Sequence, residues 1–456
     1  MDWRNEPITA SHWQFLEDKN KVECKLCPRH CELKEGQDGF CRVRGNQGNE
    51  LKSFNYGKAI PATIETIETE AIYHHSPGAR ILSMGNIGCM MACSFCQNWQ
   101  TSQIKHLDNK NVVVYSPEEV IELALKNDID IISWTYNDPV VWHEFVLDTS
   151  RLAQKNNIKT LYKSALYIES KPLDELIEVI DIFSISLKSM DDEMYRKISK
   201  ARLEPVLRGI KQIYDSGKHL EVSQLVVTDL NDDGVDAKKT AEWMLKNLDS
   251  SIPLHLVGYH PAFRYKAKRT SLETLLKARE IAITAGIEYC YLGNVYAENV
   301  SNTHCKTCSQ KLVDRFGLTI KVSGLNEKSE CENCGELSPI VHPKSQKEEE
   351  IKTYDYTEEQ YFDIKWDSEI NALHLVVEDP TKDQIILQVE RQPSSKVEYF
   401  ELNVGLERII LTKSEENETS IRLGANSSNT LHCLPVLDRA HFPTIETDTE
   451  SKKYLN

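Results

Sequence analysis

Short apolar runs alternate with amphipathic segments between about residues 79 and 292. The apolar runs are rich in Val, Ile and Leu, as strands buried on both faces are. Between them the spacing predicts helices, and the first opens at Ser116-Pro117 with an N-cap serine and a proline at its first position. The expected strands are 81–84, 129–134, 158–162, 182–187, 220–227, 253–259 and 288–292, and the expected helices begin near 116, 140, 173, 204, 237 and 272.

Strands that alternate with helices of this length require right-handed parallel crossovers. The fold class is therefore α/β, with a parallel sheet covered on both faces. If such a sheet curls into a full or partial (β/α) barrel, the loops that follow the strands gather on one face, where active sites collect. Polar residues stand at several of these strand ends, and the functional residues are expected among them.

From about residue 348 the pattern changes to short alternating runs separated by charged turns, at 372–377, 384–389, 397–404 and 408–411. This pattern predicts a small antiparallel β domain. Residues 345–456 hold 12 Lys and Arg against 23 Asp and Glu, so most of the formal charge of −16 lies there. A solvated surface is the default interpretation of that charge, with partner docking as the alternative. Residues after 448 are expected to be disordered.

The composition excludes several classes of protein. The length of 456 residues suits about three domains, and a hydrophobic share of 40% is enough for real cores. A formal charge of −16 disfavours nucleic-acid binding. No signal-like or membrane-spanning apolar stretch is present, so a cytoplasmic protein is expected. Thirteen cysteines in a reducing compartment then indicate metal ligation, not disulfides.

The central cysteine group is Cys89, Cys93 and Cys96, spaced C-x3-C-x2-C directly after an expected strand. Three thiolates from one loop can hold a [4Fe–4S] cluster and leave one iron without a protein ligand. A structural zinc or a chance cluster is the alternative, although structural zinc sites favour paired C-x2-C knuckles.

Two outer cysteine groups flank this one. The first can enclose a zinc or an auxiliary iron–sulfur cluster, with His30 as a substitute ligand or a surface histidine. The second has two C-x2-C pairs 22 residues apart, which reads as a zinc ribbon, with an auxiliary cluster as the alternative. The first group comprises Cys24, Cys27, Cys31 and Cys41, and the second comprises Cys305, Cys308, Cys331 and Cys334.

The central spacing, with Phe95 before its third cysteine, resembles the signature of radical S-adenosylmethionine (radical SAM) enzymes. The ordered motifs over about residues 20–340 are similar to radical SAM proteins of the AmmeMemoRadiSam system, relatives of pyruvate formate-lyase activating enzymes. They include the cysteine-rich leader, Asn55-Tyr56-Gly57, the run from Tyr73 to Gly78, Tyr259-His260-Pro261, Tyr291 to Asn294 and Thr303 to Cys308. The resemblance implies a partial parallel barrel of the radical SAM type. It also implies that SAM chelates the open iron and is cleaved to a 5'-deoxyadenosyl radical.

The resemblance also implies roles for residues at the strand ends. Phe95 would sit near the adenine, and Tyr136, Asn137 and Asp138 would form the loop that receives the amino group of SAM. Ser164 ends the next strand, Ser186 and Lys188 would face the ribose and the carboxylate, and His260 would lie beside the cofactor. The chain departs from the family where Asp138 replaces Glu, Ser164-Ala165 replaces Asn-Gly, and Ser186 replaces Asp.

The sequence thus predicts an oxygen-sensitive radical SAM enzyme that abstracts hydrogen from an unidentified protein or small molecule. A glycyl-radical-enzyme activase and a non-catalytic iron–sulfur or zinc scaffold are the alternatives. The implied partners are a flavodoxin or ferredoxin electron donor and the substrate, with no nucleic acid and no membrane. The expected domains are a Cys-rich segment (1–75), the barrel (76–300), the ribbon (301–345) and an acidic β domain (346–456).

Overall fold

The structure is a computed structural model that describes two parts of the chain. The first is residues 3–343, except Tyr296, Glu298 and Leu318. The second is a set of tail segments, 353–356, 362–365, 370–378, 384–394, 396–403, 408–412, 418–425 and 429–437. The disorder expected after residue 448 concerns residues outside these ranges. Among the helices described, none has both the length and the apolar character that crossing a membrane requires.

Seven parallel strands form the centre of the fold, paired in the order β9-β11-β12-β13-β14-β15-β16. The expected parallel sheet is therefore confirmed. The described path of strands ends at β16, and on its other side β9 pairs with the antiparallel strand β8 (Thr63–Thr66). The seven strands are β9 (Arg80–Gly85), β11 (Ile131–Thr135), β12 (Lys159–Ser164), β13 (Ile182–Leu187), β14 (His219–Val226), β15 (Leu254–Gly258) and β16 (Cys290–Gly293).

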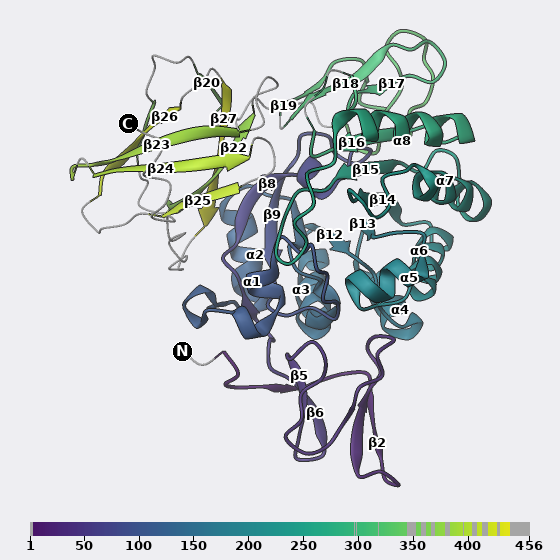
Figure 1. Cartoon of the computed structure of the whole chain (residues 1–456), viewed down its shortest axis with the longest axis vertical. Coiled ribbons are helices and arrows are strands. Elements are labelled where there is room, and N and C mark those ends of the chain that lie inside the picture. The colour runs from purple at the N-terminus through teal and green to yellow at the C-terminus, as the bar shows by residue number, and fades with distance from the viewer. Residues whose placement is uncertain are drawn as a thin grey trace.

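Helices cover the outer face of this sheet, as Figure 1 shows. The first long helix begins with a capping box, in which the Ser116 hydroxyl accepts from the Glu119 N–H and the Glu119 carboxylate accepts from the Ser116 N–H. The helices are α1 (Trp99–Ser102), α2 (Pro117–Lys126), α3 (His143–Lys155), α4 (Ser170–Val179), α5 (Asp192–Met194), α6 (Glu204–Asp215), α7 (Val235–Asn247) and α8 (Leu272–Ala285). Short turns of other types are η1 (Ile67–Glu70), η2 (Ile104–His106), η3 (Asn109–Asn111), η4 (Pro139–Trp142) and the π-helical η5 (Tyr195–Ser199).

The N-terminal segment folds into two small sheets, ordered β1-β6-β5 and β2-β3-β4, which the sequence did not predict. Its buried Val22, Leu51 and Phe54 belong to the same apolar core as Met84 and Trp134 of the barrel. This N-terminal module therefore packs continuously onto the barrel. Its strands are β1 (Ile8–Thr9), β2 (Trp13–Leu16), β3 (Lys21–Cys24), β4 (Glu32–Leu33), β5 (Arg44–Gln47) and β6 (Glu50–Ser53), and β7 (Lys58–Ala59) pairs with β10 (Val113–Val114).

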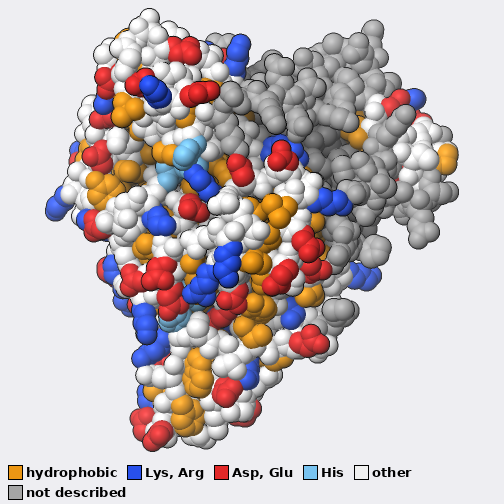
Figure 2. All heavy atoms as spheres, turned by 180° about the vertical axis from the view of Figure 1, so that it is seen from behind, with side chains coloured by type: hydrophobic (Ala, Val, Ile, Leu, Met, Phe, Trp, Pro, Cys, Tyr) orange, Lys and Arg blue, Asp and Glu red, His pale blue; other side chains and the backbone are white. Residues whose placement is uncertain are grey.

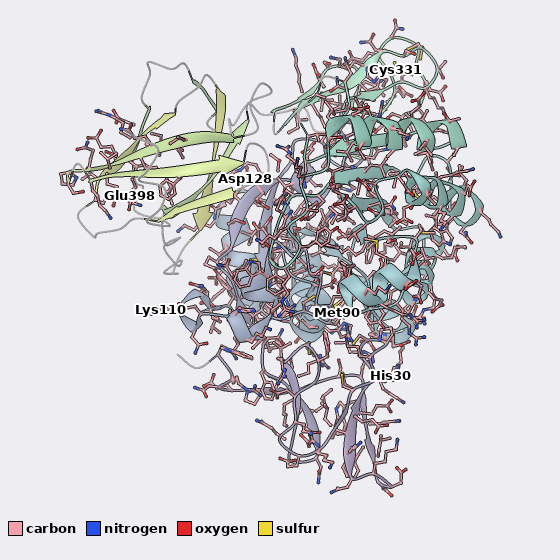
Figure 3. The ribbon with its side chains drawn as sticks, viewed as in Figure 1. His30, Met90, Lys110, Asp128, Cys331 and Glu398 are labelled. Atoms are coloured by element: carbon pink, nitrogen blue, oxygen red, sulfur yellow. The ribbon has the colours of Figure 1, made fainter. Side chains whose placement is uncertain are left out.

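The cysteine ribbon holds β17 (Thr303–His304), β18 (Lys311–Phe316) and β19 (Thr319–Val322). It contacts the segment that precedes β9, because Arg315 pairs with Glu68 at 3.3 Å and the Ser76 N–H donates to the Val341 carbonyl oxygen at 2.8 Å. The ribbon therefore lies at the amino edge of the parallel sheet. Figure 3 shows Cys331 and His30 toward opposite ends of the molecule, with Met90 between them.

The tail forms antiparallel strands, as expected. Some of these strands make a separate sheet, and the others extend the sheet of the barrel. One group, in the order β21-β26-β23-β24, is a sheet of its own, while β27 pairs with β8 at Val436 and Thr63. The barrel sheet thereby continues into β27, β22, β25 and β20. The bounds are β20 (Thr353–Tyr356), β21 (Phe362–Lys365), β22 (Ile370–Glu378), β23 (Gln384–Gln392), β24 (Lys396–Asn403), β25 (Arg408–Thr412), β26 (Ser420–Ala425) and β27 (Asn429–Leu437).

Candidate functional site

The central cysteine loop, residues 86–98, follows β9 at the carboxyl edge of the parallel sheet. Gly88 has a φ of +84°, and a Cβ there would lie 2.7 Å from Val43 Cγ1 of the N-terminal module. On its other side the loop is fixed to η5, since the Ala92 N–H donates to the Ser199 carbonyl oxygen at 3.1 Å. Protein contacts therefore hold the loop from two sides.

The loop brings the thiols of Cys89, Cys93 and Cys96 near one another, and all three cysteines are half-buried. Burial raises the pKa of Cys96 to about 11. It also raises the pKa of Cys89, and the nearby Asp138 and Cys93 add to that effect. Cluster ligands are thiolates, so a bound metal would have to supply the free energy of ionisation. A donor set of three thiols fits a [4Fe–4S] cluster with one iron left for another ligand.

The loop after β11 is tied to the cysteine loop through two asparagines. Asn137 Nδ2 donates to the Asn86 carbonyl oxygen and, at 3.0 Å, to Thr101 Oγ1. Asn98 Nδ2 donates to the carbonyl oxygen of Tyr136 at 2.6 Å, and Tyr136 has a φ of +64°. Sequence reasoning placed Tyr136 and Asn137 in a cofactor loop, and the structure shows that their polar groups position the cysteine loop.

Asp138, in the loop after β11, contacts Ser164 at the end of β12 directly. Ser164 Oγ donates to Asp138 Oδ1 at 2.8 Å, and the Ala165 N–H donates to Oδ2 at 2.8 Å. The Val140 N–H also donates to Oδ1, at 3.2 Å. Burial nevertheless raises the pKa of Asp138 above its usual range. Two positions at which the chain departs from the family, Asp138 and Ser164-Ala165, are thus coupled in space.

Lys188 brings positive charge to the same region, since its ammonium group opposes the rise that burial causes in the pKa of Cys93. It acts in the same way on the pKa of Asp138. Ser186 is the second-last residue of β13, and its Oγ is 3.3 Å from Ser223 Oγ on β14. Lys188 therefore lies near the thiols and the carboxylate, while Ser186 contacts its neighbour on the next strand.

Phe95 of the cysteine loop lies near Tyr259, and Gln97 of the same loop contacts His260, in the segment that follows β15. Gln97 Nε2 is 3.0 Å from His260 Nδ1, and the ring centroids of Phe95 and Tyr259 are 6.5 Å apart. Burial lowers the pKa of His260 to about 4, so this imidazole is neutral at pH 7. The ring therefore offers a neutral donor or acceptor.

The four cysteines of the N-terminal module line one small cavity together with Phe40 and Met90. Burial raises the pKa of Cys41 to about 11. Four thiols around a common cavity can hold a zinc ion or an auxiliary cluster. Unlike the ribbon sulfurs, they are not among the groups of described residues whose ligand atoms lie within 4.8 Å of one another. The four are Cys24, Cys27, Cys31 and Cys41.

His30 does not line that cavity. Its exposed ring lies between two carboxylates, with Nδ1 3.0 Å from Glu23 and Nε2 3.1 Å from Glu169. Of the two roles considered for His30, this position matches the surface histidine.

The four sulfurs of the ribbon lie within 4.8 Å of one another. The Sγ atoms of Cys305 and Cys334 are 3.6 Å apart, as are those of Cys308 and Cys331. Tetrahedral bonds of about 2.3 Å to one zinc put sulfurs about 3.8 Å apart. A cubane spreads its ligands over four irons and needs wider spacing. The spacing therefore fits a single ion.

Sequence reasoning missed Lys163, a half-buried lysine of the barrel on β12. Lys163 Nζ donates to the Glu70 carbonyl oxygen at 3.0 Å, to Ser184 Oγ at 3.0 Å and to Ser223 Oγ at 3.3 Å. Burial lowers the pKa of Lys163 to about 8. β12 reads Lys-Thr-Leu-Tyr-Lys-Ser, so a lysine near the end of this mixed strand gives no strong local signal.

The chain is similar to several known proteins. The profile of the radical SAM superfamily matches residues 86–244. An uncharacterized protein of Methanocaldococcus jannaschii is 36% identical over 334 residues, which cover 73% of this chain and 99% of that protein. The (2S)-3-sulfopropanediol dehydratase activating enzyme of Klebsiella oxytoca is 24% identical over 51% of this chain and 74% of its own length. The pyruvate formate-lyase 1-activating enzyme of Escherichia coli K12 is 23% identical over 42% and 78%, respectively.

Proposed function

Because this chain belongs to the radical SAM superfamily, we propose that Cys89, Cys93 and Cys96 hold the [4Fe–4S] cluster at which SAM is cleaved. When bound, the cluster supplies the electron that splits SAM into methionine and a 5'-deoxyadenosyl radical. The gathering of three half-buried thiols in one fixed loop supports this assignment, since it leaves one iron for SAM.

The residues around the thiols have complementary tasks toward SAM. A carboxylate has about four acceptor positions. The protein uses three of those on Asp138, so one remains for the SAM ammonium group. Lys188 supplies a cation for the SAM carboxylate, and Ser186 supplies a hydroxyl for the ribose. Phe95 and the neutral His260 lie beside the adenosine, and Tyr136, Asn137 and Ser164 hold the surrounding loops in place.

The radical abstracts a hydrogen atom from a substrate that is a protein or a small molecule. The motifs that resemble the AmmeMemoRadiSam type support a role outside glycyl-radical activation. A glycyl-radical-enzyme activase is the second candidate, because two relatives are named as activating enzymes. A non-catalytic scaffold is the third, and it would follow if the changes at Asp138, Ser164 and Ser186 abolished SAM binding. A flavodoxin or ferredoxin is the electron donor under the first two.

Anaerobic 5'-deoxyadenosine formation from SAM and dithionite tests this assignment. Wild type is expected to form the nucleoside, and Cys93→Ala is expected to lose the activity with about one four-iron cluster. Cys290→Ala is the matched control, since Cys290 is a buried cysteine outside the three groups. If wild type carries a full cluster and SAM but forms no 5'-deoxyadenosine, both enzymatic candidates are excluded and the non-catalytic scaffold remains.

The two outer groups have separate roles under this proposal. The ribbon cysteines, Cys305, Cys308, Cys331 and Cys334, bind zinc and stabilise the fold at the amino edge of the sheet. The N-terminal cysteines bind a zinc or an auxiliary cluster close to the central loop, where Met90 lines their cavity. The division into four domains, 1–75, 76–300, 301–345 and 346–456, stays a proposal, and the N-terminal module shares the apolar core of the barrel.

A further inference from the structure

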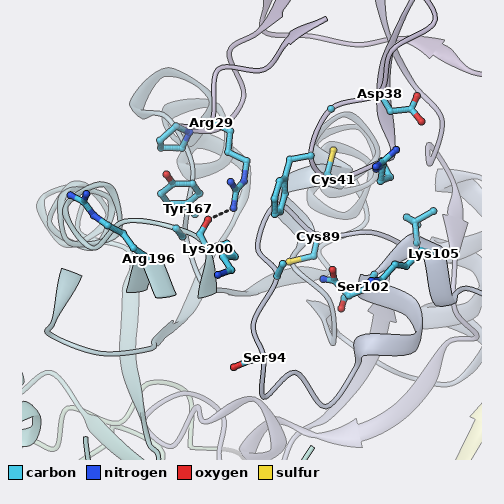
Figure 4. Close-up of a pocket in the computed structure, with 18 of the residues that line it drawn as sticks. Arg29, Asp38, Cys41, Cys89, Ser94, Ser102, Lys105, Tyr167, Arg196 and Lys200 are labelled. Carbon is cyan, nitrogen blue, oxygen red and sulfur yellow. Dashed lines mark hydrogen bonds between the residues drawn. The ribbon is translucent and has the colours of Figure 1, made fainter. Parts of the chain in front are cut away.

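A basic cleft of about 1610 Å³ opens beside the central cysteine loop, between the N-terminal module and the carboxyl edge of the sheet. Cys41 and Cys89 both line it, and Figure 4 shows Cys89 between walls that carry Arg29 and Arg196 on one side and Lys105 on the other. Nine Lys and Arg line the cleft against two carboxylates, in a chain whose formal charge is −16. By contrast, Figure 2 shows both charges interspersed over the face that it presents.

Most of this positive charge is not neutralised by the protein. Of the two carboxylates, Asp38 is paired with Arg4 at 2.7 Å and Glu32 with Lys19 at 2.6 Å. Five exposed cations of the cleft make no salt bridge with any residue that the structure describes. Such a concave surface of one sign raises the local concentration of an oppositely charged partner and its association rate. The five are Arg42, Lys105, Lys200, Arg202 and Arg264.

The cleft reaches the cysteine loop without touching the cofactor side. None of the residues proposed above to contact SAM, such as Asp138, Lys188 and His260, lines it. A substrate must approach the reactive carbon of the cofactor, whereas an electron has only to reach the cluster. The volume also exceeds the roughly 300–1,000 Å³ of small-molecule pockets. A protruding part of an acidic protein fits these conditions.

We propose that this cleft is the docking site of an acidic electron-transfer protein. The donor is oxidised by one electron, which enters past Cys41 and Cys89 and reduces the cluster. This inference rests on the proposed function, because it assumes a cluster on the central loop. Attraction between the cleft cations and donor carboxylates sets the affinity and its salt dependence.

Binding of an acidic plant-type [2Fe–2S] ferredoxin to the reconstituted protein tests the docking site directly. The cleft variant carries Lys105→Glu, Arg202→Glu and Arg264→Glu. The control variant carries Lys239→Glu, Lys246→Glu and Lys277→Glu on α7 and α8, outside the cleft, and changes the net charge equally. At low salt the cleft variant is expected to bind labelled ferredoxin at least about tenfold more weakly, and the control within about threefold of wild type. Equal losses in both variants, or none in the cleft variant, would overturn the docking site.

The rate of 5'-deoxyadenosine formation with two reductants gives a second readout. The cleft variant is expected to keep its dithionite-driven rate and to lose its ferredoxin-driven rate. A parallel fall of both rates would mean that the cleft serves the cofactor, and would overturn docking. Loss of polyglutamate binding with unchanged ferredoxin binding would assign the cleft to an acidic substrate instead. If wild type forms no product with dithionite, the proposed function fails, whatever the binding measurement gives.

Discussion

The side-chain amide of Asn137 joins two loops, and its loss tests how the cysteine loop is held. Asn137→Ala leaves the Asn86 carbonyl oxygen and the Thr101 hydroxyl without this donor. An unsatisfied buried polar group costs about 1–3 kcal/mol. We therefore expect a lower Tm and faster loss of iron in air, measured by thermal unfolding and by iron content over time.

Asn156→Ala is the control for that change, since the exposed Asn156 amide donates, among the residues described, only to the Leu152 carbonyl oxygen near the end of α3. It should leave both measurements close to wild type. Equal behaviour of the two variants would show that the Asn137 bonds do not hold the loop.

His74 gives a pH dependence of stability. Burial lowers its pKa to about 3, and its Nε2 is 2.7 Å from the Tyr291 hydroxyl. In the unfolded chain the His74 imidazole binds a proton near pH 6.5, whereas in the folded chain it stays neutral until about pH 3. The free energy of unfolding therefore decreases as the pH falls below 6.5. The slope approaches roughly 1.4 kcal/mol per pH unit for this group. Urea unfolding at pH 7, 6 and 5 should show a shallower slope for His74→Gln than for wild type, and parallel slopes would contradict the assignment.

Single residues were predictable from sequence where spacing alone decides the chemistry, as for Cys89, Cys93 and Cys96. The Asp138–Ser164 contact was not, because it depends on the register of β11 against β12. Lys163 was missed for a similar reason. Whether its side chain meets Ser184 and Ser223 inside the barrel depends on how the sheet curls, which no local pattern records.

At the scale of elements, the ribbon is separable from the central loop. It contacts the chain before β9, whereas the cysteine loop follows β9. Cys308→Ala is expected to lower zinc by about one ion per chain and to leave iron unchanged, both measured by elemental analysis. Cys290→Ala should change neither metal. Loss of iron from Cys308→Ala would mean that the ribbon binds a cluster or supports the central site.

The main strands and the long helices between residues 79 and 292 were predictable because they carry their own apolar pattern, and α2 and α8 also begin at N-cap serines. The N-terminal strands were not, since they are only two to four residues long and leave no period to read. The pairing of β27 with β8 joins segments far apart in the chain. The local sequence of a strand does not determine with which distant strand it pairs.

For the whole molecule, the tail covers an edge of the barrel sheet. Removing residues 346–456 uncovers β8, and an unpaired edge strand is a template for association. The truncated protein is expected to keep its iron and its dithionite-driven activity but to aggregate at lower concentration, as measured by light scattering. A monodisperse truncated protein would show that the tail does not protect this edge.

The bonds that fix residues 86–98 come from the chain itself, through Gly88, Ala92, Asn98 and Asn137. The order of maturation follows from this. The polypeptide can reach its native shape first and receive inorganic iron and sulfide afterwards, with little further ordering to oppose insertion. Damage by oxygen then becomes repairable, because a protein that has lost its cluster keeps the folded loop into which a new cluster can be inserted.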